Sequence, residues 1–440
     1  MKPSDFIITI VSLAISALTA TAQETWTLQR CIDHAKEQNI IIKQRRVSVE
    51  QAELSVRDAR AERLPGVSFS TSQSFNNRPF AASSSMINGS QVVTTSHKNT
   101  YTGSYGISAS MPLYDGGKIN NTVRLNQLES RIAELNVDAA ELSIEEEITR
   151  VYIQILYSSE AITQDDEQIA LSQAQVDRAR ALFDAGLLNR ADVAQLESQL
   201  ANDRYQRVAD ETTLSDYTLQ LKQLLELDGD TTLVVADPDI TTDALAPLPI
   251  KANVYAAALE SRPEVKAQLL ALDRSALDET IARAGMLPSL SLNAGMNSNN
   301  SSGNGNMFTQ LKNQWSNAVG VTLSIPIYDR GKTRNAIARA RLEREQAELD
   351  LQNTRKTLWK SIETYHLNAT SAQQRYLAAL EREKAARTSY ELTSEQFRLG
   401  LKNIVELQTD KTALSAAVQQ TLQAKYMAAL NGALLRLYAR

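Results

Sequence analysis

The sequence predicts a mixed α and β fold in which long helical hairpins alternate with short strands, built from two copies of one unit. Three observations predict it: two long tracts without glycine or proline, four segments of alternating apolar and polar residues, and motifs that recur in order in both halves. Of the 440 residues, 43% are hydrophobic and 22% charged. Only 16 Gly and 10 Pro are present, in a few clusters, so disorder and collagen are excluded.

The first 22 residues are typical of a secretory signal peptide. Lys2 precedes an apolar stretch from Phe6 to Leu18, and Ala20-Thr21-Ala22 provides small residues for cleavage before Gln23. The alternative is a short membrane anchor, but the stretch is shorter than the ~20 residues that span a bilayer. We therefore expect an exported chain. No other segment has 18 consecutive apolar residues, so any membrane insertion would use strands.

Charge and residue counts exclude several classes of protein. Lys plus Arg total 46 against 51 Asp plus Glu, and this net charge of -5 argues against a nucleic-acid binder. The single cysteine, Cys31, excludes a disulfide framework and is expected to be a small buried apolar residue. The three histidines are scattered, and no Ser/His/Asp or paired-carboxylate motif stands out. We therefore expect no enzyme activity, no metal site and no cofactor.

Three motif pairs indicate an internal duplication. They are Arg63 to Phe69 with Met286 to Leu292 at an offset of 223, and, at an offset of 214, Met111 to Lys118 with Ile325 to Lys332 and Phe183 to Asn189 with Phe397 to Asn403. We expect a first repeat over 23–230, a linker over 231–250 and a second repeat over 251–440. The offset changes where the first copy carries a polar insert, Ala81 to Thr100, which is expected to be an exposed loop. The equivalent segment of the second copy is also a polar loop, Asn297 to Asn306.

Each copy contains a long tract that predicts a coiled-coil-like helix. Gly117 and Gly186 enclose 68 residues without glycine or proline, as do Gly331 and Gly400. At about 1.5 Å per residue, each helix would be roughly 100 Å long. The helices are expected to turn at residues 186–189 and 400–403, where glycine fits a left-handed helix end. In the first copy, segments 29–64 and 191–226 would match the long helix when placed end to end.

Four segments with a period of two predict strands, in hairpins at about 66–113 and 289–326. The segments are Val67 to Phe75, Tyr101 to Leu113, Leu290 to Met296 and Val319 to Ile325. One face is apolar and the other carries Ser, Thr, Asn or Gly. Open edges leave backbone groups unpaired in lipid, so several copies would have to close the sheet; three would give twelve strands and four would give sixteen. A soluble sandwich is the alternative.

With these motifs, the mature chain resembles the TolC-like outer-membrane efflux protein family along essentially its whole length. The resemblance is carried by Trp26-Thr27-Leu28 with Ala35 and Asn39, the two Leu-Pro strand entries, Pro112 to Lys118, Arg262-Pro263-Glu264-Val265, and the Gly-Leu hairpin turns. It implies long α-helical coiled-coil hairpins that form a periplasmic tunnel, and four strands that each chain gives to a trimeric, twelve-stranded transmembrane β-barrel in the outer membrane. It also implies a passive channel of a tripartite efflux or type I secretion system, a periplasmic adaptor protein and an inner-membrane pump.

The same resemblance implies roles for the hairpin ends. The adaptor-contacting residues would be Gly186, Leu187, Leu188 and Asn189 in the first hairpin and Gly400, Leu401, Lys402 and Asn403 in the second. Asp192 and Glu406 occupy positions of gate carboxylates, Asp410 lies beside the position of a second acidic ring, and Lys402 is expected to pair with Asp192. Asp192 and Glu406 are equally consistent with ordinary charges at helix N-termini. The rival function is an exported coiled-coil scaffold or adhesin without a pore.

Overall fold

The computed structural model describes residues 25–80, 84–88, 91–95, 99–236, 238, 240–302 and 306–439. The predicted signal peptide lies outside these residues. The chain forms two compact units. The helical unit comprises Met1–Arg46, Leu135–Lys266 and Asn353–Arg440, and the sheet unit comprises Val47–Glu134 and Ala267–Gln352. Each unit therefore combines segments from both predicted repeats. No helix within the described ranges is long and apolar enough to cross a membrane.

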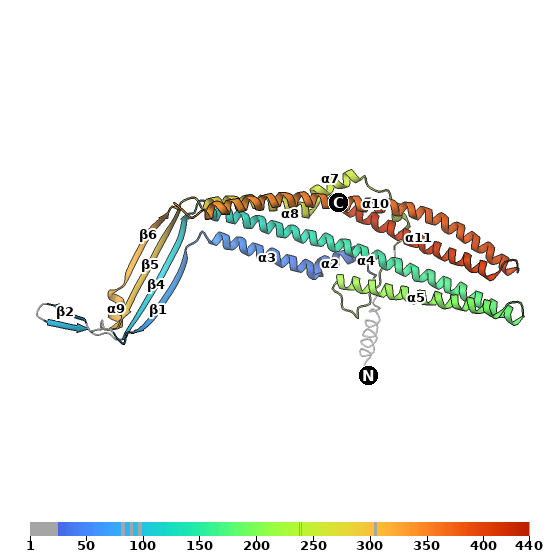
Figure 1. The fold of residues 1–440 in the computed structure, drawn as a ribbon, viewed down its shortest axis with the longest axis horizontal. Coiled ribbons are helices and arrows are strands. Elements are labelled where there is room, and N and C mark those ends of the chain that lie inside the picture. Colours follow the sequence, from blue (N-terminus) through green and yellow to red (C-terminus); the bar gives the residue numbers. More distant parts are fainter. Residues whose placement is uncertain are drawn as a thin grey trace, which may run out of the picture. The chain divides into compact units, whose positions relative to one another are not determined.

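The sheet unit contains a four-stranded antiparallel sheet in the order β1-β4-β5-β6 (Figure 1). The strands are β1 (Gly66–Asn77), β4 (Asn99–Tyr114), β5 (Ser289–Ser301) and β6 (Ser316–Ser324). The four predicted strands are confirmed, each with longer or shifted ends. β4 and β5, one from each half of the sequence, pair in the middle, which leaves β1 and β6 as the two edges.

Strand register puts the apolar residues of the sheet on one face. Ile107 pairs with Phe69 on one side and with Met296 on the other. The opposite face is polar, because the Ser68 and Ser108 hydroxyl groups lie 2.8 Å apart and Ser110 Oγ donates to Asn293 Oδ1 at 2.9 Å. The alternation predicted from sequence is therefore confirmed in space. Most of the apolar side chains are exposed; on the two edge strands they are Val67, Phe69, Phe75, Val319, Val321 and Leu323.

Two parts of the sheet unit differ from the sequence prediction. The insert Ala81 to Thr100 was expected to be a loop, but it contains the hairpin β2 (Ser84–Asn88) and β3 (Gln91–Thr95). The expected loop Asn297 to Asn306 is also shorter, because β5 continues to Ser301 and a short helix, α9 (Met307–Asn313), follows. Gln310 of α9 binds both backbone groups of Ser301, at 2.7 and 3.0 Å, so helix and strand end stabilise each other.

The two strand-to-helix turns have the same geometry. Asp115 accepts hydrogen bonds from the backbone N–H groups of Gly117 and Ile119, at 3.0 and 2.6 Å, and Asp329 accepts from Gly331 and Thr333 at 3.0 and 2.7 Å. Each aspartate thus satisfies the first donors of a long helix. Gly117 and Gly331 have φ of 83° and 78°, which favours glycine. The duplicated Asp-x-Gly-Lys motif is therefore a helix start.

Two helical hairpins form most of the helical unit. The first is α4 (Lys118–Asp184) with α5 (Arg190–Leu224), and the second is α10 (Lys332–Arg398) with α11 (Ile404–Tyr438) (Figure 1). α4 and α10 have 67 residues each, as the glycine-free tracts predict, and each also contributes its first turns to the sheet unit. The remaining helices are α2 (Leu28–Gln38), α3 (Ile40–Ala61), α6 (Thr241–Ala244), α7 (Lys251–Ser261) and α8 (Pro263–Ala284).

The predicted end-to-end placement holds for α5 and α3, whereas segment 29–64 is not one helix, because it breaks at Asn39 between α2 and α3. Asn39 Nδ2 donates to Leu224 O at the end of α5, at 2.9 Å, while its Oδ1 accepts from Ile41 N at the start of α3. Glu226 Oε1 also accepts from Ile40 N at 3.1 Å. One buried asparagine therefore joins the end of one helix to the start of another.

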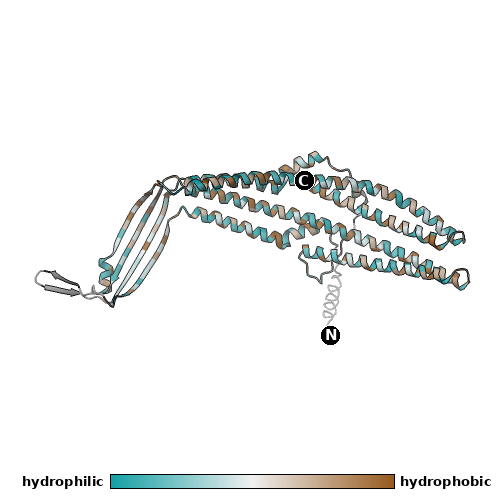
Figure 2. Ribbon diagram, viewed as in Figure 1, coloured by the Kyte–Doolittle hydropathy of each residue, from teal (hydrophilic) through white to brown (hydrophobic). Residues whose placement is uncertain are grey.

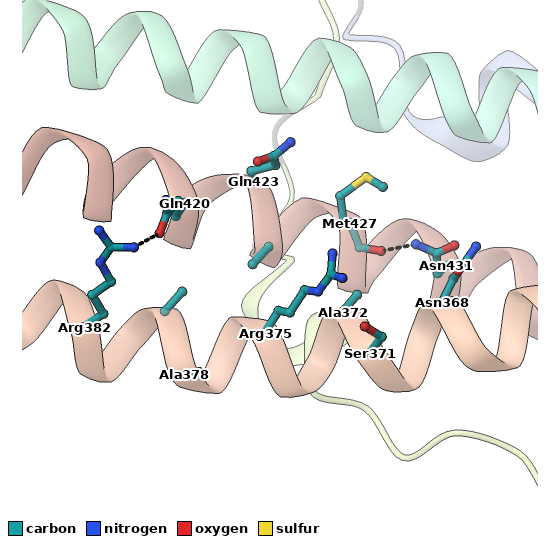
Figure 3. Close-up of a pocket in the computed structure, with 12 residues that line it drawn as sticks. Asn368, Ser371, Ala372, Arg375, Ala378, Arg382, Gln420, Gln423, Met427 and Asn431 are labelled. Atoms are coloured by element: carbon teal, nitrogen blue, oxygen red, sulfur yellow. Dashed lines mark hydrogen bonds between the residues drawn. The ribbon is translucent and has the colours of Figure 1, made fainter.

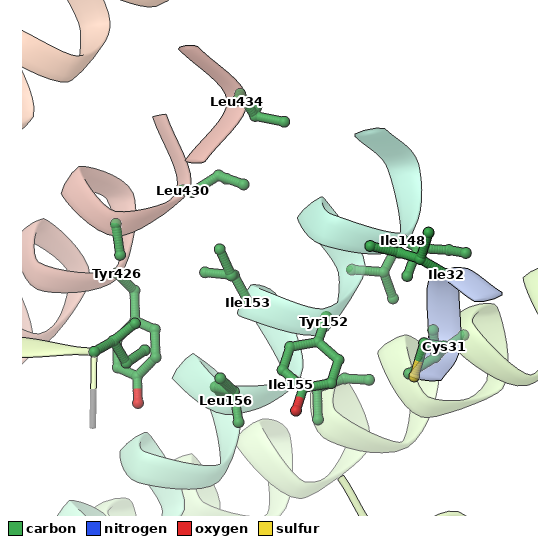
Figure 4. Close-up of a cluster of buried hydrophobic side chains, with 14 of the residues drawn as sticks. Cys31, Ile32, Ile148, Tyr152, Ile153, Ile155, Leu156, Tyr426, Leu430 and Leu434 are labelled. Carbon is green, nitrogen blue, oxygen red and sulfur yellow. The ribbon is translucent and has the colours of Figure 1, made fainter. Parts of the chain in front are cut away.

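The main core of the helical unit lies where α2, α4 and α11 meet the linker. Figure 4 shows part of this cluster, including Cys31 and Ile32 of α2, Ile148 and Tyr152 of α4, and Leu430 of α11. Cys31 is fully buried, as predicted, and burial raises the pKa of its thiol to about 12. Elsewhere along both hairpins hydrophobic and hydrophilic segments alternate (Figure 2), as expected for helices with one packed and one solvated side.

Candidate gate and docking surface at the hairpin ends

Both hairpins turn through a left-handed glycine followed by an asparagine cap. Gly186 and Gly400 have φ of 75° and 76°. The next residue in each turn donates its N–H back across the helix end, from Leu187 to Leu182 O and from Leu401 to Gln396 O, at 2.9 Å in both cases. This is the Schellman arrangement, which satisfies carbonyl groups that the helix leaves free. The predicted turn positions and the role of glycine are confirmed.

The turns expose apolar side chains to solvent. Leu187 is 74% exposed and Leu401 is 71% exposed, while Leu188 and Lys402 are half-buried. Asn189 and Asn403 use their side chains to cap α5 and α11, so their amides are committed to the turn. An exposed leucine on a rigid, capped turn is a typical feature of a docking surface. The predicted adaptor-contact residues are therefore accessible, and their role stays a prediction.

Lys402 binds Glu406 in this chain, and the expected pair with Asp192 is not formed. Lys402 and Glu406 form a short ion pair one helical turn apart, and Glu406 Oε2 accepts from Asn403 N at 3.2 Å. The Lys402 ammonium, with the Asn403 N–H, lowers the pKa of Glu406. Asp192 is in the first turn of α5, where its N–H donates to Asn189 Oδ1 at 2.9 Å. Lys402 directly precedes the N-cap Asn403, which places it beside Glu406 in the first turn of α11.

Asp410 faces the partner helix of its own hairpin. Its Oδ2 accepts hydrogen bonds from Ser389 Oγ at 3.1 Å and from Thr393 Oγ1 at 2.6 Å, both on α10. Of the four gate candidates, the structure therefore brings together only Lys402 and Glu406. Asp410 links α11 to α10.

A buried charge pair that sequence reasoning missed lies between the two hairpins. Lys411 of α11 is 2% exposed, and its Nζ lies 3.1 Å from Asp203 Oδ2 on α5. Ser172 of α4 binds both groups through short hydrogen bonds, and Gln199 Nε2 donates to Asp203 Oδ1 at 2.6 Å. Burial lowers the pKa of Lys411, and the negative charge of Asp203 partly offsets this by raising it. The signal was present in the sequence, because Lys411 continues the spacing of Leu407 and Leu414.

Two amide contacts extend this link between the hairpins. Gln408 Nε2 donates to Gln199 Oε1 at 2.6 Å, and Gln175 Nε2 donates to the Tyr390 hydroxyl at 2.9 Å. Leu200 and Val176 of the first hairpin pack with Ile404 of the second in a small apolar cluster near the turns. The two hairpins of one chain are therefore joined by polar contacts as well as by apolar packing.

A second missed group is Asp165 on α4. It is 9% exposed, and its Oδ2 is buried without a hydrogen-bond donor among the described residues. Burial raises the pKa of Asp165 to about 7, and the neighbouring Asp210 contributes further. A buried carboxyl group opposite another carboxyl group favours a bound proton.

Within the part of the chain that the structure describes, no group of three or more His, Cys, Asp or Glu residues is arranged to hold a metal ion.

Comparisons with known proteins identify the family. The chain is 22% identical over 350 residues to the outer membrane efflux protein BepC of Brucella suis, covering 78% of this chain and 73% of BepC. It is 23% identical over 332 residues to the outer membrane protein TolC of Vibrio cholerae, covering 73% of each. The crystal structure of CusC superposes with a TM-score of 0.80 at 17% identity, over 94% of this chain and 91% of CusC.

The sequence model of the family described as outer membrane efflux protein matches residues 31–226 and 254–439. The two matched segments contain both hairpins, both pairs of long strands and all the hairpin-end residues described above. The chain therefore belongs to the outer membrane efflux protein family.

Proposed function

We propose that three copies of this chain form a passive exit duct of a tripartite efflux or type I secretion system. The observation that carries the proposal is the four-stranded sheet, whose apolar face is exposed and whose edge strands β1 and β6 have no partner on their outer sides in the described sheet. A lipid bilayer accepts an apolar face but not an open edge. Copies of the chain that pair β1 with β6 of a neighbour satisfy both requirements.

The choice of three copies rests on the family. Four strands from each of three chains give a twelve-stranded barrel, within the range of outer-membrane barrels. The structural relative CusC forms a transmembrane channel. In this arrangement the polar strand face lines the water-filled interior and the apolar face contacts outer-membrane lipid. The insert 81–100 and the segment 297–306 would then lie outside the cell.

The hairpin ends would provide the periplasmic contacts. Leu187 and Leu401 are the exposed apolar residues of the two turns, and we propose that they and their turn neighbours contact an adaptor protein, which joins the duct to an inner-membrane pump. Lys402 lies in the second hairpin turn, and Asp192, Glu406 and Asp410 lie within the first two helical turns beyond the hairpin ends, where a gate would close the passage. The duct itself performs no chemistry, and the pump supplies the energy.

Reconstitution tests the duct directly. The protein, purified from outer membranes in mild detergent, should have three times the mass of one chain and conduct ions across planar lipid bilayers. A monomer that passes no ions would contradict the proposal, and release from membranes by high salt alone would favour the scaffold. In the same assay, Lys402→Ala should increase conductance if Lys402 helps to hold the gate closed. An unchanged conductance would exclude that role.

A further inference from the structure

A groove runs between α10 and α11 in the helical unit. It has a volume of about 560 Å³, and its lining includes Arg375, Arg382, Gln420 and Gln423 (Figure 3). The other lining residues are uncharged, so the groove contains two arginines and no carboxylate. Arg375 and Arg382 are one heptad apart on α10, about 10 Å along the helix axis, and so lie on the same side of it.

The two arginines carry charge that the chain does not neutralise. Arg382 donates to Gln420 Oε1, an uncharged partner, and neither arginine has a carboxylate within ion-pair distance among the described residues. Some other arginines of the same helix do form ion pairs: Arg387 pairs with Glu383 at 2.8 Å, and Arg398 pairs with Glu395. The groove therefore holds two arginines that form no ion pair with the described residues, on a chain of net charge -5.

The linker packs against the opposite side of the same two helices. Gln373 Nε2 donates to Ala246 O at 2.8 Å, and Gln373 is two residues from Arg375, about 200° around the helix. On α11, Ala429 and Ala433 line a cavity with Pro238, Pro247 and Pro249. Met427, which lines the groove, is likewise two residues from Ala429. The linker therefore covers one face of the hairpin, and the arginine groove lies on the other.

We propose that Arg375 and Arg382 form an anion-attracting band on the inner wall of the duct, which favours passage of negatively charged solutes. This inference rests on the proposed duct. A second layer of chain on the inside would obstruct a passage, so the linker belongs outside and the groove faces the interior. Three copies bring six arginines together, three at each of two levels about 10 Å apart. A water-filled passage whose wall carries charges of one sign concentrates ions of the opposite sign. Arginine also binds carboxylate and phosphate groups, and by the same charge-assisted hydrogen bonds sulfonate groups.

Ion selectivity tests the proposal. The reversal potential in a KCl gradient gives the ratio of chloride to potassium permeability. In the double variant Arg375→Gln/Arg382→Gln this ratio should fall about twofold or more, because the local anion concentration falls. Arg375→Lys/Arg382→Lys keeps the charge and should keep the ratio. Lys384→Gln removes one charge nine residues from Arg375, on the opposite side of α10, and should leave the ratio unchanged.

The outcomes separate this proposal from the duct itself. An assembled glutamine variant that conducts with the wild-type permeability ratio would overturn the arginine band and leave the duct intact. An equal change in Lys384→Gln, or loss of the ratio in the lysine variant, would also overturn it, because the effect would then not follow the charge in the groove. A wild-type protein that conducts no ions would instead contradict the duct. Assembly of each variant is checked by its mass in detergent.

Discussion

At the scale of single residues, Asp165 should make stability depend on pH. Its pKa in the folded chain, about 7, lies above the ordinary aspartate value, so between roughly pH 4 and pH 7 the folded state binds more protons than the unfolded state. Stability therefore falls as pH rises through that window and stays low above it. Near neutral pH the deprotonated form leaves a buried carboxylate oxygen without a donor.

Asp165→Asn removes this dependence. The variant should gain about 2 kcal/mol over the wild type at pH 8 and little or nothing at pH 4. Thermal unfolding followed by circular dichroism across this range measures the difference. The neighbouring Asp166 is the control, because it is exposed and pairs with Arg207 at 2.5 Å, so Asp166→Asn should not stabilise the protein at pH 8. Parallel pH curves for wild type and Asp165→Asn would contradict the assignment.

At the scale of helices and strands, Lys411 joins the two hairpins. Lys411→Met leaves Asp203 buried without its cation, which should cost about 3–5 kcal/mol. Adding Asp203→Leu removes the stranded charge, so the double variant should recover much of the loss. Unfolding temperatures of Lys411→Met, of Asp203→Leu and of the double variant measure this coupling. Losses that simply add, with the double variant least stable, would show that the two side chains act independently.

The sequence predicted elements better than it predicted contacts between them. Glycines with positive φ mark the hairpin turns, and 67-residue helices follow directly from tracts without breakers. Partners such as Lys411 and Asp203 depend on how one long helix is rotated against another. An α-helix drifts about 20° per heptad from a strict seven-residue repeat, so the facing side cannot be extrapolated over so many turns. The short α9 and the β2–β3 hairpin were missed because elements of five to seven residues are too short to show a clear period.

At the scale of the whole molecule, one face of the sheet should contact outer-membrane lipid and the other face should contact water. Val319 of β6 pairs with Ala294 and lies on the apolar face, whereas Thr322 lies on the polar face and accepts from Asn293 Nδ2 at 3.1 Å. The two residues are three positions apart on the same edge strand, so they lie on opposite faces of the sheet, and both pair with β5. They make a matched pair of sites for a charge.

Arginine at the two sites should therefore have opposite consequences. Val319→Arg places a guanidinium against lipid, at a cost of about 2–4 kcal/mol in each copy near the bilayer midplane, while Thr322→Arg places it in water. The amount of assembled oligomer in outer-membrane fractions, measured on unheated gels, should fall for Val319→Arg and remain near wild type for Thr322→Arg. Equal assembly of both variants would mean that this face does not contact lipid. In the proposed trimer the cost is tripled per assembly, so even its lower limit should be visible.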